Sequence, residues 1–194
     1  MIAGMIAAND QVYGVDAASA GKNGVSKYAI GLSQPGWDDA TRETMNDAGV
    51  NVIRQISGSI KNYGWRSLAN PVTDSSWLDF GNARLFTGMS AELQDIAENY
   101  VFENIDGQNG ETIQDFHNSL ASALLAHFAV GDLFGDTPDQ AFLVDTGPSV
   151  NTLQTIANLE LHATIQVRMS PFAEYIEIQI VKRQLSDVIQ APTA

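Results

Sequence analysis

The side chains best suited to bind a metal ion are three histidines, His117, His127 and His162. His117 and His127 are ten positions apart, which on one helix separates them by about 15 Å along the axis and by roughly 80° around it. They cannot share a metal ion, and no His-Glu-x-x-His motif occurs. The sequence has no cysteine, which excludes thiolate ligands, thiol nucleophiles and disulfides. We therefore expect structural roles for the histidines.

Two loops have residue types that occur in ion-binding and phosphate-binding sites. Asp132, Asp136 and Asp139 are spaced four and three apart with no closing glutamate, which differs from a calcium loop. The stretch 21–26 (GKNGVS) has its glycines and lysine in a different order from a phosphate-binding loop. Carboxylates are numerous, but none forms a pattern specific to catalysis. The sequence predicts no metal, no cofactor and no enzymatic activity.

Two long amphipathic helices are the elements most clearly indicated by periodicity. The first is expected over about 82–102 and the second over about 112–130, where Thr112–Asp115 resembles a capping box and Gly131 ends the helix. Their apolar residues recur at spacings of three and four. The first stripe is Phe86, Met89, Leu93, Ile96 and Tyr100, and the second is Ile113, Phe116, Leu120, Leu124 and Phe128.

Strands are predicted on both sides of these helices. Strict apolar–polar alternation over 159–169 and again over 176–180 indicates two closing strands, each with one face in the core. Shorter extended pieces are expected at 50–56, 60–68 and 141–145, and short helical segments at 38–48 and 149–156. The first 36 residues are predicted to form loops with short strands, of which 27–32 is the best candidate. The expected class is an α/β (α+β) sandwich, with a mixed β-sheet packed on two main helices and a C-terminal extension strand.

Length and charge limit the classes of partner. The 194 residues, with 44% hydrophobic and 17% charged residues, fit a single folded domain over 1–183, followed by an arm over 184–194. A net charge of −13 argues against nucleic acid as the main partner. No apolar run of about 18 residues occurs, so we expect no membrane insertion, and the N-terminus does not resemble a signal peptide.

The negative charge is unevenly distributed along the chain. From Leu85 to Val167 there is no lysine or arginine, but there are twelve aspartates and glutamates. This stretch either keeps the surface soluble or forms an acidic face that docks on a basic partner. Glu92, Asp95 and Glu98 avoid the apolar stripe of the first long helix, so they are the candidate docking residues.

Five segments, in order along the chain, resemble the C-terminal half of contractile-tail sheath proteins from bacteriophages and related injection machines. Gly4–Gly14 resembles the family's G-x-x-A-x-x-D stretch, and Ala48–Arg54 (AGVNVIR) resembles its AGINVIR strand. Tyr63–Leu68 (YGWRSL) is similar to W-G-x-R-T-L. Trp77–Leu85 resembles the start of the family's long helix, and Ser170–Ile176 (SPFAEYI) resembles the joint between its closing strands. The sequence departs from the family at Ala83, where an arginine is usual, and at Asn158, where a glycine is usual.

The resemblance implies a structural subunit that polymerises helically around an inner tube and contracts to drive that tube through a membrane. Its partners would be other sheath subunits and a tail tube protein, with no nucleic acid. The particle would be a virion tail or an injection machine assembled in the bacterial cytoplasm. Because sheath proteins usually have several hundred residues before this region, we expect a fragment, a processed product or a short subunit. The alternative is an acidic soluble enzyme or binding domain with an unrecognised site.

The last eleven residues, 184–194, are too short to form a layer of their own. Leu185, Val188 and Ile189 nevertheless provide apolar side chains that need a partner. In the resembled family such an arm adds a strand to a neighbouring subunit's sheet. The alternative is a frayed terminus.

Overall fold

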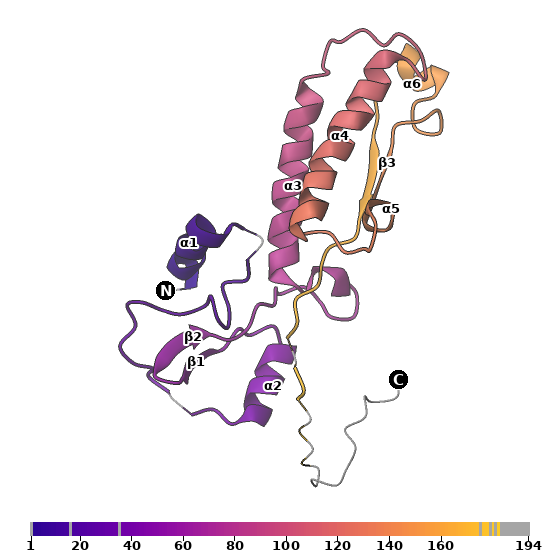
Figure 1. Ribbon diagram of the computed structural model, residues 1–194. Coiled ribbons are helices and arrows are strands. Elements are labelled where there is room, and N and C mark those ends of the chain that lie inside the picture. The colour runs from indigo at the N-terminus through magenta and orange to yellow at the C-terminus, as the bar shows by residue number, and fades with distance from the viewer. Residues whose placement is uncertain are drawn as a thin grey trace.

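A pair of packed helices, α3 (Phe80–Glu98) and α4 (Glu111–Val130), forms the longest part of the molecule (Figure 1). The coordinates are a computed structural model that describes residues 2–15, 17–34, 36–174, 176–178, 180 and 182. The short helix α5 (Pro138–Ala141), the strand β3 (Phe142–Asp145), α6 (Leu153–Ala157) and β4 (Thr164–Val167) lie along α4. We call α3, α4, α5, β3, α6 and β4 the hairpin lobe.

The remaining elements form a second group at the N-terminal end of α3. They are α1 (Ile2–Tyr13), α2 (Asp39–Asp47), β1 (Ile53–Ile56), β2 (Ser59–Asn62) and the 3-10 helix η1 (Ser75–Trp77). We call these elements, together with the residues that connect them, the small-sheet lobe. After β4 the chain runs back past the start of α3 and alongside α2, so its C-terminal segment contacts the small-sheet lobe (Figure 1).

The core of the hairpin lobe is formed by the apolar faces that the sequence predicts. Leu124 is 0% exposed, and Leu120 and Ile113 are each 1% exposed. The central cluster is Met89, Phe116, Leu120, Leu124, Leu133, Ala141 and Val144. One side of the predicted alternating strand covers this cluster, through Leu161, Ala163, Ile165, Val167 and Met169. Most of the two stripes and of the inward face of this strand is confirmed, but Phe86 of the first stripe is 38% exposed and Leu159, where the alternation begins, is 92% exposed.

The ends of the helices show which capping residues act. Asp79 Oδ1 accepts hydrogen bonds from the backbone N–H groups of Gly81 and Asn82, and thereby starts α3. Gly131, at φ 93°, ends α4 as predicted. The capping box predicted at Thr112 is wrong, because Asp106 accepts the hydrogen bonds from Glu111 and Thr112. An aspartate outside the helix thus satisfies these N–H groups.

The α+β class is confirmed, but the arrangement of the strands differs from a single mixed sheet. Within the described residues the strands form two separate two-stranded antiparallel sheets, β1–β2 and β3–β4. The predicted strand at 159–169 is reduced to β4, with one further bridge between Met169 and Leu133. Its partner β3 has four residues and lies between α5 and the turn that begins at Gly147. The short length of β3 therefore limits the number of residues that pair in the β3–β4 sheet.

The N-terminal region is the clearest correction. Residues 2–13 form the helix α1 instead of loops, and 27–32 contains no strand. Alanine is the strongest helix former, and five alanines or isoleucines in this stretch outweigh the cost of Gly4. Tertiary contacts hold the helix as well: Asp10 pairs with Arg84 of α3 at 2.5 Å, and the Asn9 amide donates to the backbone oxygen of Ala17.

Candidate assembly surface

The three histidines lie at separate places, as their spacing predicts. His117 Nδ1 is 3.4 Å from Thr146 Oγ1, and His162 Nε2 is 3.2 Å from Glu160. His127 lies between Asp132 and Glu92, so Asp132 of the aspartate loop bonds to a histidine. Among the described residues, no group of three or more histidine, cysteine, aspartate or glutamate side chains could hold a metal ion. None of the described helices is both long enough and apolar enough to span a membrane.

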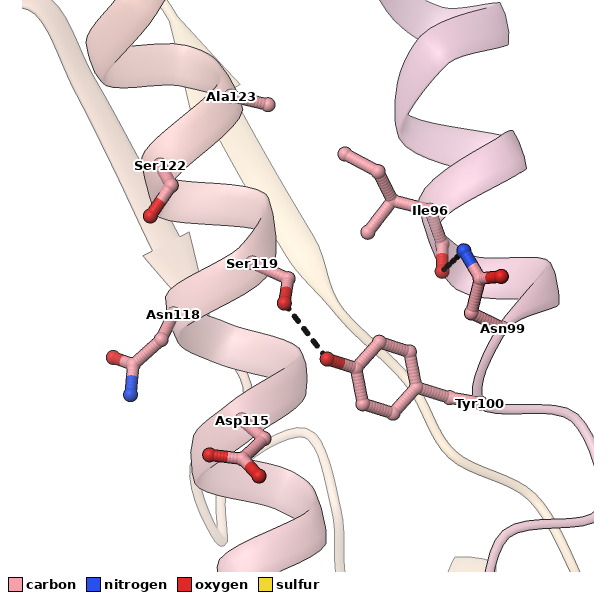
Figure 2. Close-up of a pocket in the computed structure, with 8 residues that line it drawn as sticks. All are labelled: Ile96, Asn99, Tyr100, Asp115, Asn118, Ser119, Ser122 and Ala123. Atoms are coloured by element: carbon pink, nitrogen blue, oxygen red, sulfur yellow. Dashed lines mark hydrogen bonds between the residues drawn. The ribbon is translucent and has the colours of Figure 1, made fainter.

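A shallow groove of about 720 Å³ lies where the C-terminal end of α3 meets the first half of α4 (Figure 2). Tyr100 and Ser119 bridge the two helices through a 2.7 Å hydrogen bond between their hydroxyl groups. The groove is lined by Ile96, Asn99, Tyr100, Asp115, Asn118, Ser119, Ser122 and Ala123. Asp115 is the only carboxylate in this set, and no base lies beside a nucleophile there. The lining therefore does not favour catalysis.

The segment after β4 is anchored first and then exposed. The Phe172 ring packs against Gly81, since a Cβ built on Gly81 would lie 2.6 Å from Phe172 Cε2. The backbone N–H of Phe172 donates to Asp79, whose pKa is raised by burial against the opposing effect of such hydrogen bonds. Glu174 then pairs with Arg66 at 2.8 Å. These contacts attach the segment to both lobes.

Beyond Glu174 the alternating isoleucines are exposed in the part of the chain that the structure describes. Ile176, Ile178 and Ile180 are 76%, 77% and 89% exposed, respectively. The prediction that this stretch is a half-buried strand is wrong, because its described residues belong to no ladder. Three alternating isoleucines are suited to pair with a sheet edge. The predicted arm residues Leu185, Val188 and Ile189, and the whole of 184–194, lie outside the described residues.

The predicted acidic docking residues Glu92, Asp95 and Glu98 are all exposed on α3, as expected from their spacing. Glu92 differs from the other two, because its carboxylate bonds to His127 Nε2 at 3.0 Å. Asp95 and Glu98 are therefore the better probes of a docking role, since changing them leaves this contact intact.

Reversing the charge of Asp95 and Glu98 should weaken assembly without unfolding the protein. The variant Asp95→Lys/Glu98→Lys should bind neighbouring or tube subunits less tightly at low salt, because a docking face acts through charge complementarity. Its melting temperature should stay close to that of the original protein, since exposed charges contribute little to stability. The control is Asp136→Lys/Asp139→Lys, which makes the same change in net charge at two exposed positions, one before α5 and one in it. Equal assembly by both variants would leave the acidic stretch only a solubilising role.

His127 joins α3 to the residues that follow α4. Its Nδ1 is 2.6 Å from Asp132, whose side chain is 8% exposed, and its Nε2 faces Glu92. Burial lowers the pKa of His127, but the hydrogen bonds with Asp132 and Glu92 outweigh it and raise the pKa above its ordinary value. A neutral imidazole has one N–H and can donate to only one of the carboxylates, whereas the protonated ring donates to both.

The stability of the hairpin lobe should therefore depend on pH through His127. A raised folded-state pKa gives stability that is fully present below the unfolded pKa of about 6.5 and is lost as the pH rises through the folded value. We expect the melting temperature to fall as the pH rises above about 6.5, and to fall less in His127→Gln. His162→Gln is the control, because that ring is 48% exposed. If the melting temperature falls equally in the original protein and in His127→Gln, His127 is not the source of the pH dependence.

The described fold, a helical hairpin on a short sheet joined to a second small sheet, is found in components of contractile injection systems. Similar solved structures include a component of the anti-feeding prophage baseplate, with a TM-score of 0.78 and 22% identity over 94% of this chain. Another is the contracted-state sheath complex of the extracellular contractile injection system PVC, with a TM-score of 0.79 and 21% identity over 94% of this chain. The contracted-state anti-feeding prophage baseplate also matches, with a TM-score of 0.78 and 24% identity over the same share.

The chain spans about half the length of each of these proteins, 49% to 50%. A comparison with models of known families finds no match, and a comparison with curated protein sequences finds none either. At these identities the likeness shows a shared fold. It agrees with the resemblance to sheath proteins noted in the sequence.

Sequence reasoning missed the residues that anchor the C-terminal segment. Gly81, Phe172, Arg66 and Glu174 all fall inside the motifs that resemble the sheath family, but they were not paired with one another. Arg66 and Glu174 are 108 positions apart. The available signal for this pair was the opposite charge of two residues that both lie in segments resembling the sheath family.

Proposed function

We propose that the chain is part of a structural subunit of a contractile sheath, which polymerises helically around an inner tube. The observation that supports this most directly is the exposed run Ile176, Ile178 and Ile180, which follows an anchored stretch without being covered. A chain that acts alone gains nothing from such a run, whereas a polymer subunit uses it to pair with its neighbour. The fold shared with injection-system components supports the same role.

In the proposed mechanism the C-terminal segment, with the arm residues Leu185, Val188 and Ile189, adds a strand to a neighbouring copy. The lobes turn as rigid bodies during contraction while these exchanged strands keep the copies connected. The partners are other copies of the subunit and a tube protein, and the acidic face of Glu92, Asp95 and Glu98 docks on one of the two. The complete particle is assembled in the bacterial cytoplasm and acts as a virion tail or an injection machine. The chain has no catalytic role.

The proposal predicts that the C-terminal segment serves assembly and not folding. In a full-length subunit, deleting 184–194, or replacing Ile178 with aspartate, should abolish long polymers and leave the melting temperature nearly unchanged. The reason is that Ile178 is already 77% exposed and the core cluster is untouched. Light scattering gives the mass of the assemblies, and negative-stain images show ribbons, rings or tubes.

Glu177→Asp is the matched control, since it lies next to Ile178 and retains the charge. It should assemble like the original protein. Loss of the fold on deleting 184–194 would show that the tail packs on its own domain. An original protein that remains a small closed oligomer at all concentrations would contradict the sheath role.

A further inference from the structure

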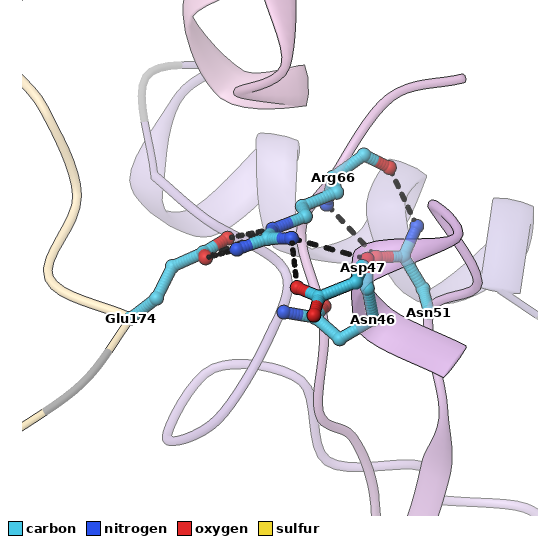
Figure 3. Close-up of polar contacts among 5 residues, drawn as sticks. All are labelled: Asn46, Asp47, Asn51, Arg66 and Glu174. Carbon is cyan, nitrogen blue, oxygen red and sulfur yellow. Dashed lines mark hydrogen bonds and ion pairs between the residues drawn. The ribbon is translucent and has the colours of Figure 1, made fainter. Parts of the chain in front are cut away.

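The guanidinium of Arg66 connects three separate parts of the chain (Figure 3). Its Nε lies 3.2 Å and 3.0 Å from the two carboxylate oxygens of Glu174, and its Nη2 lies 2.8 Å from Oε2. Its Nη1 donates to Asp47 Oδ1 at 3.1 Å and to the backbone oxygen of Asn46 at 3.2 Å. The C-terminal segment, the end of α2 and the stretch after β2 therefore meet at one side chain.

The backbone of Arg66 is itself fixed before the side chain acts. Asn51 accepts the Arg66 N–H with its Oδ1 and donates to the Arg66 carbonyl through its Nδ2, both at 2.8 Å (Figure 3). Gly64 leaves room for this amide, because a Cβ there would lie 2.7 Å from Asn51 Oδ1. A planar guanidinium on a fixed backbone presents its donors in one direction, which suits a two-pronged contact with a carboxylate.

The place of this contact along the chain suggests its purpose. Glu174 lies two residues before Ile176, where the exposed isoleucines begin. We propose that Arg66 is a positioning residue that holds Glu174 and so sets where, and in which direction, the C-terminal segment leaves the body. This inference rests on the proposed function, in which that segment reaches a neighbouring copy. A segment held in its bound direction loses less conformational freedom on binding.

Stability is a poor explanation for the same contact. The Arg66 and Glu174 side chains are 25% and 41% exposed, and ion pairs in contact with water contribute little to folding. Phe172 already attaches the segment to Gly81 two residues earlier. The contact between Arg66 and Glu174 therefore fixes the direction of the C-terminal segment, which Phe172 already attaches to α3.

The absence of native cysteine allows a direct test with two spin labels, at Thr44→Cys on exposed α2 and at Glu177→Cys on the segment. Pulsed electron paramagnetic resonance then gives the distribution of distances between them. In the otherwise unchanged protein the distribution should be narrow, and Glu174→Gln should widen it at least about twofold, since the charged contact is lost. Asp47→Asn is the matched control, because it removes a carboxylate partner of Arg66 that does not belong to the segment.

The melting temperature of Glu174→Gln should stay within about 2 °C of the original, which separates positioning from folding. An unchanged width in Glu174→Gln, or equal widening in Asp47→Asn, would overturn the proposal. Glu174→Gln should also form polymers at least about fivefold more slowly than Asp47→Asn, because its segment is no longer pre-oriented. Equal rates would overturn the positioning role. If the original protein forms no polymer, the sheath function fails, and the distance distributions still decide whether Arg66 positions the segment.

Discussion

Replacing Leu124 with alanine should lower the free energy of unfolding by about 2–5 kcal/mol, the range for large-to-small changes in a packed core. Leu124 is 0% exposed and lies in the cluster that joins α3, α4 and β3. Neighbouring Leu120 and Phe116 come from the same helix and cannot close the space without bending it. Urea denaturation measures the change directly.

Leu125 provides the matched control, because it is the next residue of the same helix and is 48% exposed. Leu125→Ala removes the same atoms but should change the free energy of unfolding by less than about 1 kcal/mol. If the two variants lose equal stability, the face of α4 that packs on the core is assigned incorrectly. Such a result would mean that Leu125 also contributes to packing, although it is half-exposed in this chain.

Replacing Gly81 with alanine should lower the free energy of unfolding by about 1–3 kcal/mol, as overpacking does in a filled site. The new methyl carbon would lie 2.6 Å from Phe172 Cε2 and 2.7 Å from Trp65 Nε1. Trp65 is 6% exposed and cannot move away easily. Phe172 is 38% exposed and can swing outward, so the variant should also loosen the C-terminal segment.

Gly88 lies two turns further along α3 and gives the opposite expectation. A Cβ there meets nothing within 4 Å, so Gly88→Ala should raise the free energy of unfolding by about 0.5–1 kcal/mol through helix propensity alone. Denaturation curves of the two variants should therefore shift in opposite directions. Equal destabilisation would mean that backbone freedom, and not the contact with Phe172, is the reason for glycine at position 81.

The two long helices, α3 and α4, could be predicted because their information is local. Met89, Leu93 and Ile96 recur on one face of α3, and that face was buried as the spacing requires. The end of α2 was equally readable, since Gly49 adopts φ 76°, a conformation that glycine accepts without strain. The candidate surface of Asp95 and Glu98 followed from the same helical period.

The remaining features depend on contacts that no short window contains. The alternation at 176–180 predicts a strand but cannot say which chain supplies its partner. The extent of β4 was set by β3, which is more than 18 positions earlier. Helix α1 is held by the pair of Asp10 with Arg84, and the C-terminal anchor joins Arg66 to Glu174. Each of these depends on residues brought together only by the complete fold.

The composition of the hairpin lobe affects how digestion experiments should be designed. Trypsin cleaves only after lysine and arginine, and 85–167 contains neither. Most of that lobe would therefore remain one peptide, 85–168, whether it is folded or unfolded, and its survival says nothing about its structure. Tryptic cuts after Arg66 and Lys182 report instead on the small-sheet lobe and on the C-terminal segment. Chymotrypsin cuts after aromatic residues, and Phe116 of α4 is only 5% exposed in the folded protein, so cleavage at this residue can follow unfolding of the hairpin.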